Sequence, residues 1–142
     1  MCGIAGLIHR GKSSNVGEEL QSMLQALKHR GPDSTGYALY ANNDGQNFIL
    51  RFKVGENVGE GSSSVNEDES VYNERKKTVD KKLSELGAIV VKDEKLTPYS
   101  YRYEMKFDKD LMDFSKAIES IESVEILSIG KSLELIKDLG DA

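Results

Sequence analysis

The chain has 142 residues, and its 24 acidic side chains outnumber 19 lysines and arginines, so its net charge is −5. This length suits one domain or two small ones, and an acidic chain without a basic block lacks the charges that nucleic-acid binding needs. No apolar stretch approaches a membrane span, and no positively charged segment precedes the apolar start, so we expect a cytoplasmic protein. The single cysteine excludes an internal disulfide and a multi-cysteine metal site, and the two histidines are too isolated to bind a metal. We therefore expect no metal and no cofactor.

The first third of the chain predicts a strand, a helix and a sharp stop. Residues 2–8 form an apolar run with two glycines, which is typical of a buried strand that other backbone approaches closely. Asn15 is a suitable N-cap for a helix over about 16–29. The apolar side chains of this helix fall on one face: Leu20, Met23, Leu24 and Leu27. The helix should end at Gly31-Pro32, because proline lacks an amide proton and biases the residue before it away from helix.

The next segments predict a hairpin and then a linker. Residues 36–41 and 47–54 are rich in strand-forming side chains, and they flank an N-D-G sequence at 43–45. Two such runs around this turn signal are typical of a β-hairpin. Residues 55–69 have almost no apolar side chains. They predict a flexible linker or mobile loop and a candidate domain boundary.

The second half of the chain predicts an alternation of strands and helices. An apolar stripe indicates a helix over 70–86 that ends at Gly87, and alternating side chains indicate a strand over 99–107 with one buried face. Further elements are expected at 88–91, 109–121 and 124–129, as strand, helix and strand; the identity of the last apolar segment, LELIKD, stays open. From residue 47 the order is thus β-α-β-β-α-β, which predicts a ferredoxin-like segment over 47–130.

Cys2 is the first candidate for chemistry. A residue as small as cysteine lets aminopeptidase remove Met1, which would leave Cys2 with both a thiol and a free α-amine. That amine has an ordinary pKa near 8, so it can act as a local base for the thiol. The alternative is that Cys2 is a small buried apolar residue near a chain end, and Cys2 taken alone favours that alternative.

The second candidate is the sequence HRGPDSTG at residues 29–36. Arg30 supplies a fixed cation with five donors, Gly31 permits a tight backbone turn, and Asp33 can accept amide hydrogen bonds and orient Arg30. Each of these residues taken separately also fits an ordinary helix stop followed by a turn.

Together, MCGIAGL at the start and HRGPDSTGYALY after one helix resemble the class II glutamine amidotransferases, which are N-terminal-nucleophile enzymes. The resemblance covers residues 1–54, and proteins similar to the first domain of glutamate synthase look closest. It implies an α+β fold: the front part of an αββα-type glutaminase domain, with the ferredoxin-like βαββαβ segment of residues 47–130 inserted. Residues 131–142 would then return toward the amidotransferase core.

The resemblance also implies a reaction and its residues. Cys2 would be the catalytic nucleophile that attacks the glutamine carboxamide, with its own α-amine as base and then as acid for the departing ammonia. A glutamyl thioester would form, and water would hydrolyse it. Arg30, Gly31 and Asp33 would shape the pocket around the nucleophile. The expected partners are glutamine and the remainder of an amidotransferase or a synthase subunit, with neither nucleic acid nor a membrane.

The chain also departs from the family pattern. No match is found for the arginine-bearing segment that grips the glutamine α-carboxylate, nor for the later Asn-Gly pair that forms the oxyanion hole. Because each oxyanion donor is worth about 100- to 1,000-fold in rate, we expect a truncated chain that is inactive alone. The alternative function is a non-catalytic binding or regulatory module, in which the ferredoxin-like segment binds a small ligand or a partner subunit.

Overall fold

The computed structural model describes residues 4–8, 10, 15–30, 34–40, 45–55 and 68–139. By its internal contacts the chain divides into two compact units. The first contains residues 1–37 and 137–142, and the second contains residues 38–136. The elements are mixed, with helices and antiparallel strand pairs, as an α+β chain requires. No helix in the described ranges is both long enough and apolar enough to cross a membrane.

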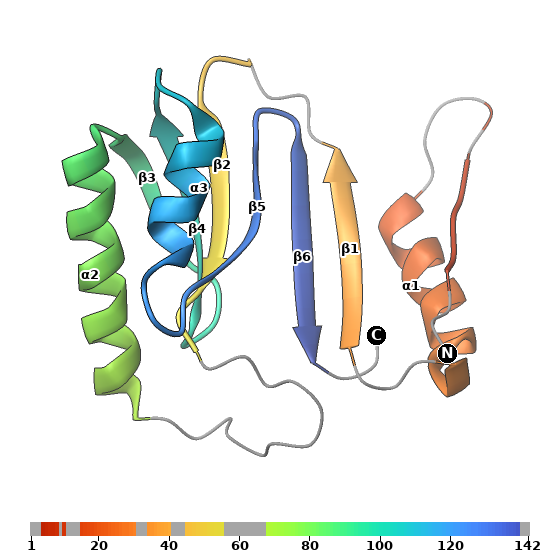
Figure 1. The fold of residues 1–142 in the computed structure, drawn as a ribbon. Coiled ribbons are helices and arrows are strands. Elements are labelled where there is room, and N and C mark those ends of the chain that lie inside the picture. Colours follow the sequence, from red (N-terminus) through yellow and green to blue (C-terminus); the bar gives the residue numbers. More distant parts are fainter. Residues whose placement is uncertain are drawn as a thin grey trace. The chain divides into compact units, whose positions relative to one another are not determined.

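A four-stranded sheet forms the centre of the second unit (Figure 1). Its strands are β2 (Phe48–Lys53), β3 (Ile89–Lys95), β4 (Ser100–Lys106) and β5 (Glu125–Gly130). The spatial order is β3-β4-β2-β5, and all three neighbouring pairs are antiparallel. The strand β2 therefore lies inside the sheet although it comes first in sequence, and β3 lies at one edge.

Two helices lie on one face of this sheet (Figure 1): α2 (Glu69–Leu86) and α3 (Leu111–Glu119). The expected helices over 70–86 and 109–121 are thus confirmed, with slightly different ends. The N-cap of α3 is Asp110, whose side chain accepts hydrogen bonds from the amides of Met112 and Asp113 at 2.8 and 2.9 Å. Such a cap satisfies amides at the helix start that have no partner within the helix.

The core of the second unit lies between the sheet and the two helices. Alternate residues of β2 and β4 point into it, and its most deeply buried side chains include Leu50, Phe52, Tyr101, Tyr103 and Met105. The predicted alternation over 99–107 is therefore confirmed. From α2 and α3 the core receives Val79, Leu83, Phe114 and Ile118. The Tyr103 hydroxyl donates a 2.6 Å hydrogen bond to Oδ1 of Asp80, which ties α2 to the sheet, and burial together with this bond raises the pKa of Tyr103.

Gly87 ends α2 in the left-handed conformation that the sequence predicts, with φ of 88°. A Cβ atom at this position would lie 3.0 Å from Nζ of Lys109, which donates to the Leu86 carbonyl. We expect Gly87→Ala to lower the free energy of unfolding by about 1 kcal/mol, because side chains strain this backbone region. Urea denaturation followed by circular dichroism measures it. Gly17→Ala is the control, since its Cβ would meet nothing within 4 Å; equal losses in both variants would contradict the prediction.

The expected hairpin over 36–41 and 47–54 is wrong. The strand β1 (Ser34–Tyr40) pairs with β6 (Leu133–Leu139) in a separate two-stranded sheet, whereas β2 pairs with β4 and β5. The open question about LELIKD is thereby settled as a strand. The turn sequence does not decide the pairing of β2. In the larger sheet β2 has two antiparallel neighbours and a buried face, and an isolated two-stranded hairpin offers neither.

The described part of the first unit contains few helices and strands. Residues 4–8 form no strand, and Ile4 and Ile8 are 93% and 91% exposed, so the expected buried strand is wrong over these residues. A strand is stable only with a hydrogen-bonded neighbour, and no described strand pairs with this segment. The helix α1 (Val16–Ala26) is followed by a 3₁₀ turn, η1 (Lys28–Arg30). Its apolar face is at most half-buried, and no residue of α1 is fully buried.

Asn15 lies at the predicted N-cap of α1 but accepts no capping hydrogen bond there. Its Nδ2 atom instead donates to Oε2 of Glu18 at 2.7 Å. Glu18 and Glu19 fall in the first turn, where negative charge is favourable at the positive end of the helix dipole. The start predicted at residue 16 is confirmed, but charge in the first turn replaces the predicted cap.

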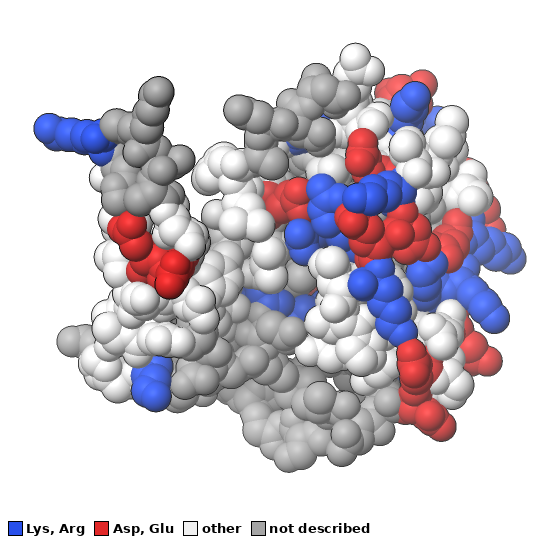
Figure 2. All heavy atoms as spheres, turned by 180° about the vertical axis from the view of Figure 1, so that it is seen from behind, with Lys and Arg blue, Asp and Glu red and all other residues white. Residues whose placement is uncertain are grey.

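The surface of the second unit carries charges of both signs. Seen from behind in Figure 2, lysine and arginine side chains are interleaved with aspartate and glutamate on this unit. Several are paired, for example Lys95 with Glu69 at 2.5 Å and Lys92 with Glu94 at 2.8 Å. On the visible face of this unit no large patch of one sign stands out that would attract a polyanion.

Candidate functional site

Three of the four predicted site residues, Cys2, Gly31 and Asp33, lie outside the described residues. Arg30 is the last residue of η1, and its backbone alone is described. The predicted linker at 55–69 also falls largely outside the described part of the chain. The proposed nucleophile and its pocket-shaping residues therefore stay predictions from the sequence.

On the sheet face opposite the helices, two arginines meet one buried glutamate. Arg51 of β2 and Arg102 of β4 are direct cross-strand partners, an arrangement that repels when both side chains are cations. Glu134 of β6 lies with both of them: its Oε2 atom accepts from Nε of Arg51 at 2.6 Å and from Nε of Arg102 at 2.9 Å, and its Oε1 atom accepts from a terminal nitrogen of Arg102 at 2.9 Å. Only 6% of Glu134 and 8% of Arg51 are exposed.

The charges of this cluster stabilise one another. Hydrogen bonding to Arg102 holds the pKa of Glu134 below its ordinary value, burial opposes this, and Arg51 lowers the pKa further. Arg102 also donates to Oε2 of Glu94 on β3 at 2.8 Å. A backbone-to-side-chain hydrogen bond supports the same attachment of β6, because the Leu135 amide donates to Oγ of Ser128 on β5 at 2.9 Å. Arg51 and Arg102 both donate to Glu134, so the cluster attaches β6 to the sheet.

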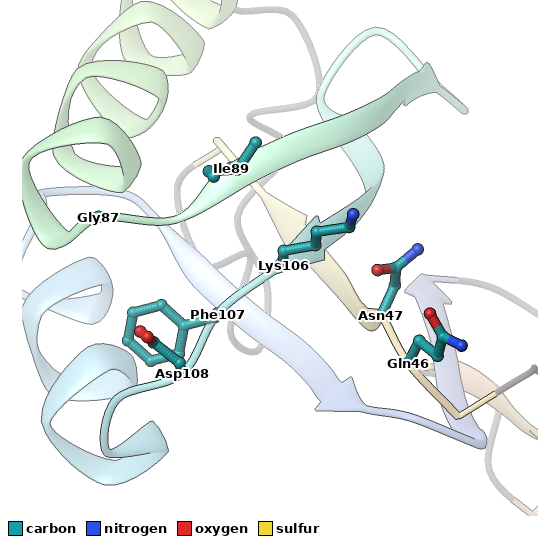
Figure 3. Close-up of a pocket in the computed structure, with 7 residues that line it drawn as sticks. All are labelled: Gln46, Asn47, Gly87, Ile89, Lys106, Phe107 and Asp108. Atoms are coloured by element: carbon teal, nitrogen blue, oxygen red, sulfur yellow. The ribbon is translucent and has the colours of Figure 1, made fainter.

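A pocket of about 400 Å³ lies at one end of the sheet in the second unit (Figure 3). It is lined by residues from the segment before β2, from the start of β3 and from the end of β4: Gln46, Asn47, Gly87, Ile89, Lys106, Phe107 and Asp108. In Figure 3 the Lys106 side chain extends toward Asn47, while Phe107 and Asp108 lie at the far end, near Gly87. Pockets of this size hold small molecules rather than macromolecules.

One buried polar atom of this pocket has no hydrogen-bond partner in the described part of the chain. The Nδ2 atom of Asn47 donates to Oε1 of Glu104 at 2.7 Å, which fixes the orientation of the amide. Its Oδ1 atom is buried and has no hydrogen-bond partner among the described residues. A buried acceptor without a donor is uncommon and calls for a specific explanation.

Sequence reasoning missed both the pocket and the buried cluster. Asn47 falls at the start of a predicted hairpin strand, and Glu134 falls in LELIKD, for which the sequence does not decide between helix and strand. Charged residues at alternate positions of β4, such as Arg102 and Lys106, indicate a polar second face. No local pattern identifies Glu134 as the counter-charge. Within the described ranges, no group of three or more His, Cys, Asp and Glu side chains could hold a metal ion.

The first 51 residues of the chain match a known protein family. Residues 1–51 match the family model described as "Glutamine amidotransferase domain". This match includes Cys2 and the whole HRGPDSTG sequence. No solved structure matches the chain significantly.

Two curated proteins are similar to this chain. A protein of Methanothermobacter thermautotrophicus named "Putative glutamine amidotransferase" is 32% identical over 145 residues, which cover 99% of this chain and 44% of that protein. A protein of Methanocaldococcus jannaschii named "Putative asparagine synthetase [glutamine-hydrolyzing] 2" is 50% identical over 40 residues, which cover 28% of this chain and 8% of that protein. The chain thus spans less than half the length of either relative. Together, the family match and the first relative support a glutamine amidotransferase domain that includes residues 1–51 of this chain.

Proposed function

We propose that this chain supplies the front part of a class II glutamine amidotransferase domain, in which Cys2 is the nucleophile. The Cys2 sulfur attacks the carboxamide carbon of glutamine, and the thiol proton passes to the α-amine of the same residue. The carbon–nitrogen bond then breaks, and the α-amine returns the proton to the leaving ammonia. Water hydrolyses the resulting glutamyl thioester to glutamate and restores the thiol. The ammonia would pass to an acceptor.

The observation that carries this proposal is the family match over residues 1–51, because it includes a cysteine directly after Met1. Arg30, Gly31 and Asp33 lie inside the same match, and we assign them to shaping the pocket around the nucleophile. The similarity to the M. thermautotrophicus protein extends over 99% of the chain. The second half therefore also has a counterpart in a protein named as an amidotransferase.

For the domain organisation we infer an amidotransferase part over 1–54, a ferredoxin-like insert over 47–130 and a return segment over 131–142. The β-α-β-β-α-β order of the elements and the antiparallel sheet order β3-β4-β2-β5 support the insert. The pairing of β6 with β1 supports the return segment, because β1 begins at Ser34, directly after the HRGPD sequence.

The mechanism requires a free α-amine on Cys2, so Met1 should be absent from the mature protein. Retained Met1 would place that nitrogen in a peptide bond and remove the proposed base. Intact-mass spectrometry of the cell-expressed protein, followed by N-terminal peptide sequencing, should show a chain that begins at Cys2. A chain that fully retains Met1 in its native host would disprove the mechanism.

A second function, a binding or regulatory module, is favoured by one observation, the pocket around Asn47. The two functions are compatible, because Cys2, Arg30, Gly31 and Asp33 belong to the first unit, whereas every residue that lines the pocket belongs to the second. Ligand binding that is unchanged in Cys2→Ala would assign the pocket a role separate from the thiol chemistry.

A further inference from the structure

We propose that the pocket around Asn47 and Lys106 binds a small zwitterion of the amino-acid class, with its carboxylate at Lys106. The proposal does not depend on the glutaminase chemistry, because every residue that lines the pocket lies in the second unit.

The buried oxygen of Asn47 has no donor among the described residues. Rotating the amide would bring Oδ1 against the Glu104 carboxylate and would lose the 2.7 Å bond from Nδ2, so the amide cannot pair itself. A buried acceptor that stays unpaired loses the hydrogen bonds it would make in water, which is unfavourable. A ligand with an N–H group, such as an ammonium or an amide, supplies the missing donor.

The charged side chains of the pocket determine which charges a ligand should carry. Lys106 and Asp108 are exposed, and neither has an ion-pair partner among the described residues. An ammonium at Lys106 favours a carboxylate, and a carboxylate at Asp108 favours a cation. The two ends of the pocket therefore suit the two charges of a zwitterion.

The walls of the pocket add apolar surface. Ile89 is 64% exposed at the edge of the sheet, and Phe107 is held by Phe114 with their ring centroids 4.6 Å apart. A purely apolar ligand would bury the Asn47 oxygen without a donor. A nucleotide or another polyanion would meet Lys106 as the single cation among the lining residues, together with the negative Asp108. A free amino acid offers a carboxylate for Lys106 and an ammonium N–H for the Asn47 oxygen or for the Asp108 carboxylate.

The test is a titration of the whole chain with L-glutamine, L-glutamate and L-leucine, in which NMR measures the chemical shifts of the backbone amides. At least one of them should give saturable shifts centred on Gly87, Ile89 and Lys106. An equimolar mixture of acetate and ammonium carries the two charges on separate molecules, so it should give no saturable chemical-shift change. The absence of a saturable shift with all three amino acids at about 10 mM, a weak affinity for a specific site, would overturn the proposal.

Variants locate the site. We expect Lys106→Glu to weaken binding at least about tenfold, because it reverses the charge that holds the carboxylate. Asn47→Leu should also weaken binding by about tenfold, because it removes the acceptor. The matched control is Lys92→Met, since Lys92 lies on the neighbouring strand, pairs with Glu94 and does not line the pocket. Lys106 is exposed, so its variant tests the site even where Asn47→Leu fails to fold. Equal affinity in Lys106→Glu and Lys92→Met would disprove the assignment.

Discussion

Replacing Glu134 with glutamine should lower the free energy of unfolding by about 3 kcal/mol, the usual cost of breaking a buried ion pair. The substitution keeps the shape of the side chain but removes its charge. Arg51 and Arg102, which are direct cross-strand partners, would then face each other without a counter-charge. Urea denaturation of the whole chain at pH 7, followed by circular dichroism, measures the change.

The control for this variant is Glu122→Gln, which removes one negative charge from an exposed turn and should change stability by less than about 0.5 kcal/mol. The double variant Arg51→Met with Glu134→Leu should recover part of the loss, because it removes the charge of Glu134 and one of the two cations that it balances. Loss of stability in Glu122→Gln equal to that in Glu134→Gln would attribute the effect to net charge rather than to the cluster.

The same glutamate gives the stability a pH dependence with a defined sign. Its pKa is lowered in the folded chain from an ordinary value of 4.5. Its contribution is therefore complete above pH 4.5 and is lost as the pH falls through the lowered pKa. Glu134→Gln should flatten the stability profile in that acidic window and leave its slope near pH 7 unchanged.

Ammonia release from glutamine by this chain should be at least about 100-fold below the common enzyme turnover of about 10 per second. The sequence contains no match for the Asn-Gly pair that supplies an oxyanion donor in the family it resembles. Cys2→Ala should remove any remaining glutamine-dependent release, because no other residue of the chain is a cysteine. An enzyme-coupled ammonia assay with purified protein measures both.

Two outcomes would contradict this prediction. Turnover near 10 per second by the unmodified chain would mean that other residues supply the oxyanion donors. Residual release that survives Cys2→Ala would remove Cys2 from the mechanism. Neither outcome bears on amino-acid binding at Lys106, so the proposed glutaminase function and the proposed binding site can be disproved independently. Lys92→Met serves as the charge-changing control, because Lys92 does not line the pocket, and it should leave the basal ammonia release unchanged.

The sequence by itself predicted the elements of the second unit because their signals are local. One apolar stripe predicts α2, and Gly87 ends it in the left-handed conformation that favours glycine. Tyr101 and Tyr103 alternate with polar residues, which predicts the buried face of β4. The motifs around Cys2 and Arg30 likewise depend on residue order alone, and the family match over residues 1–51 agrees with them.

Tertiary structure alone decided the partners of the strands. An N-D-G turn favours a hairpin between neighbouring segments, yet β2 pairs with β4 and β5, and β1 pairs with β6. Strand pairing depends on the total surface that the sheet buries, and that total includes segments far away in sequence. Glu134 shows the same principle for charge. Its carboxylate binds Arg51 from 83 positions away, and only the folded sheet brings the two arginines that need it onto one face.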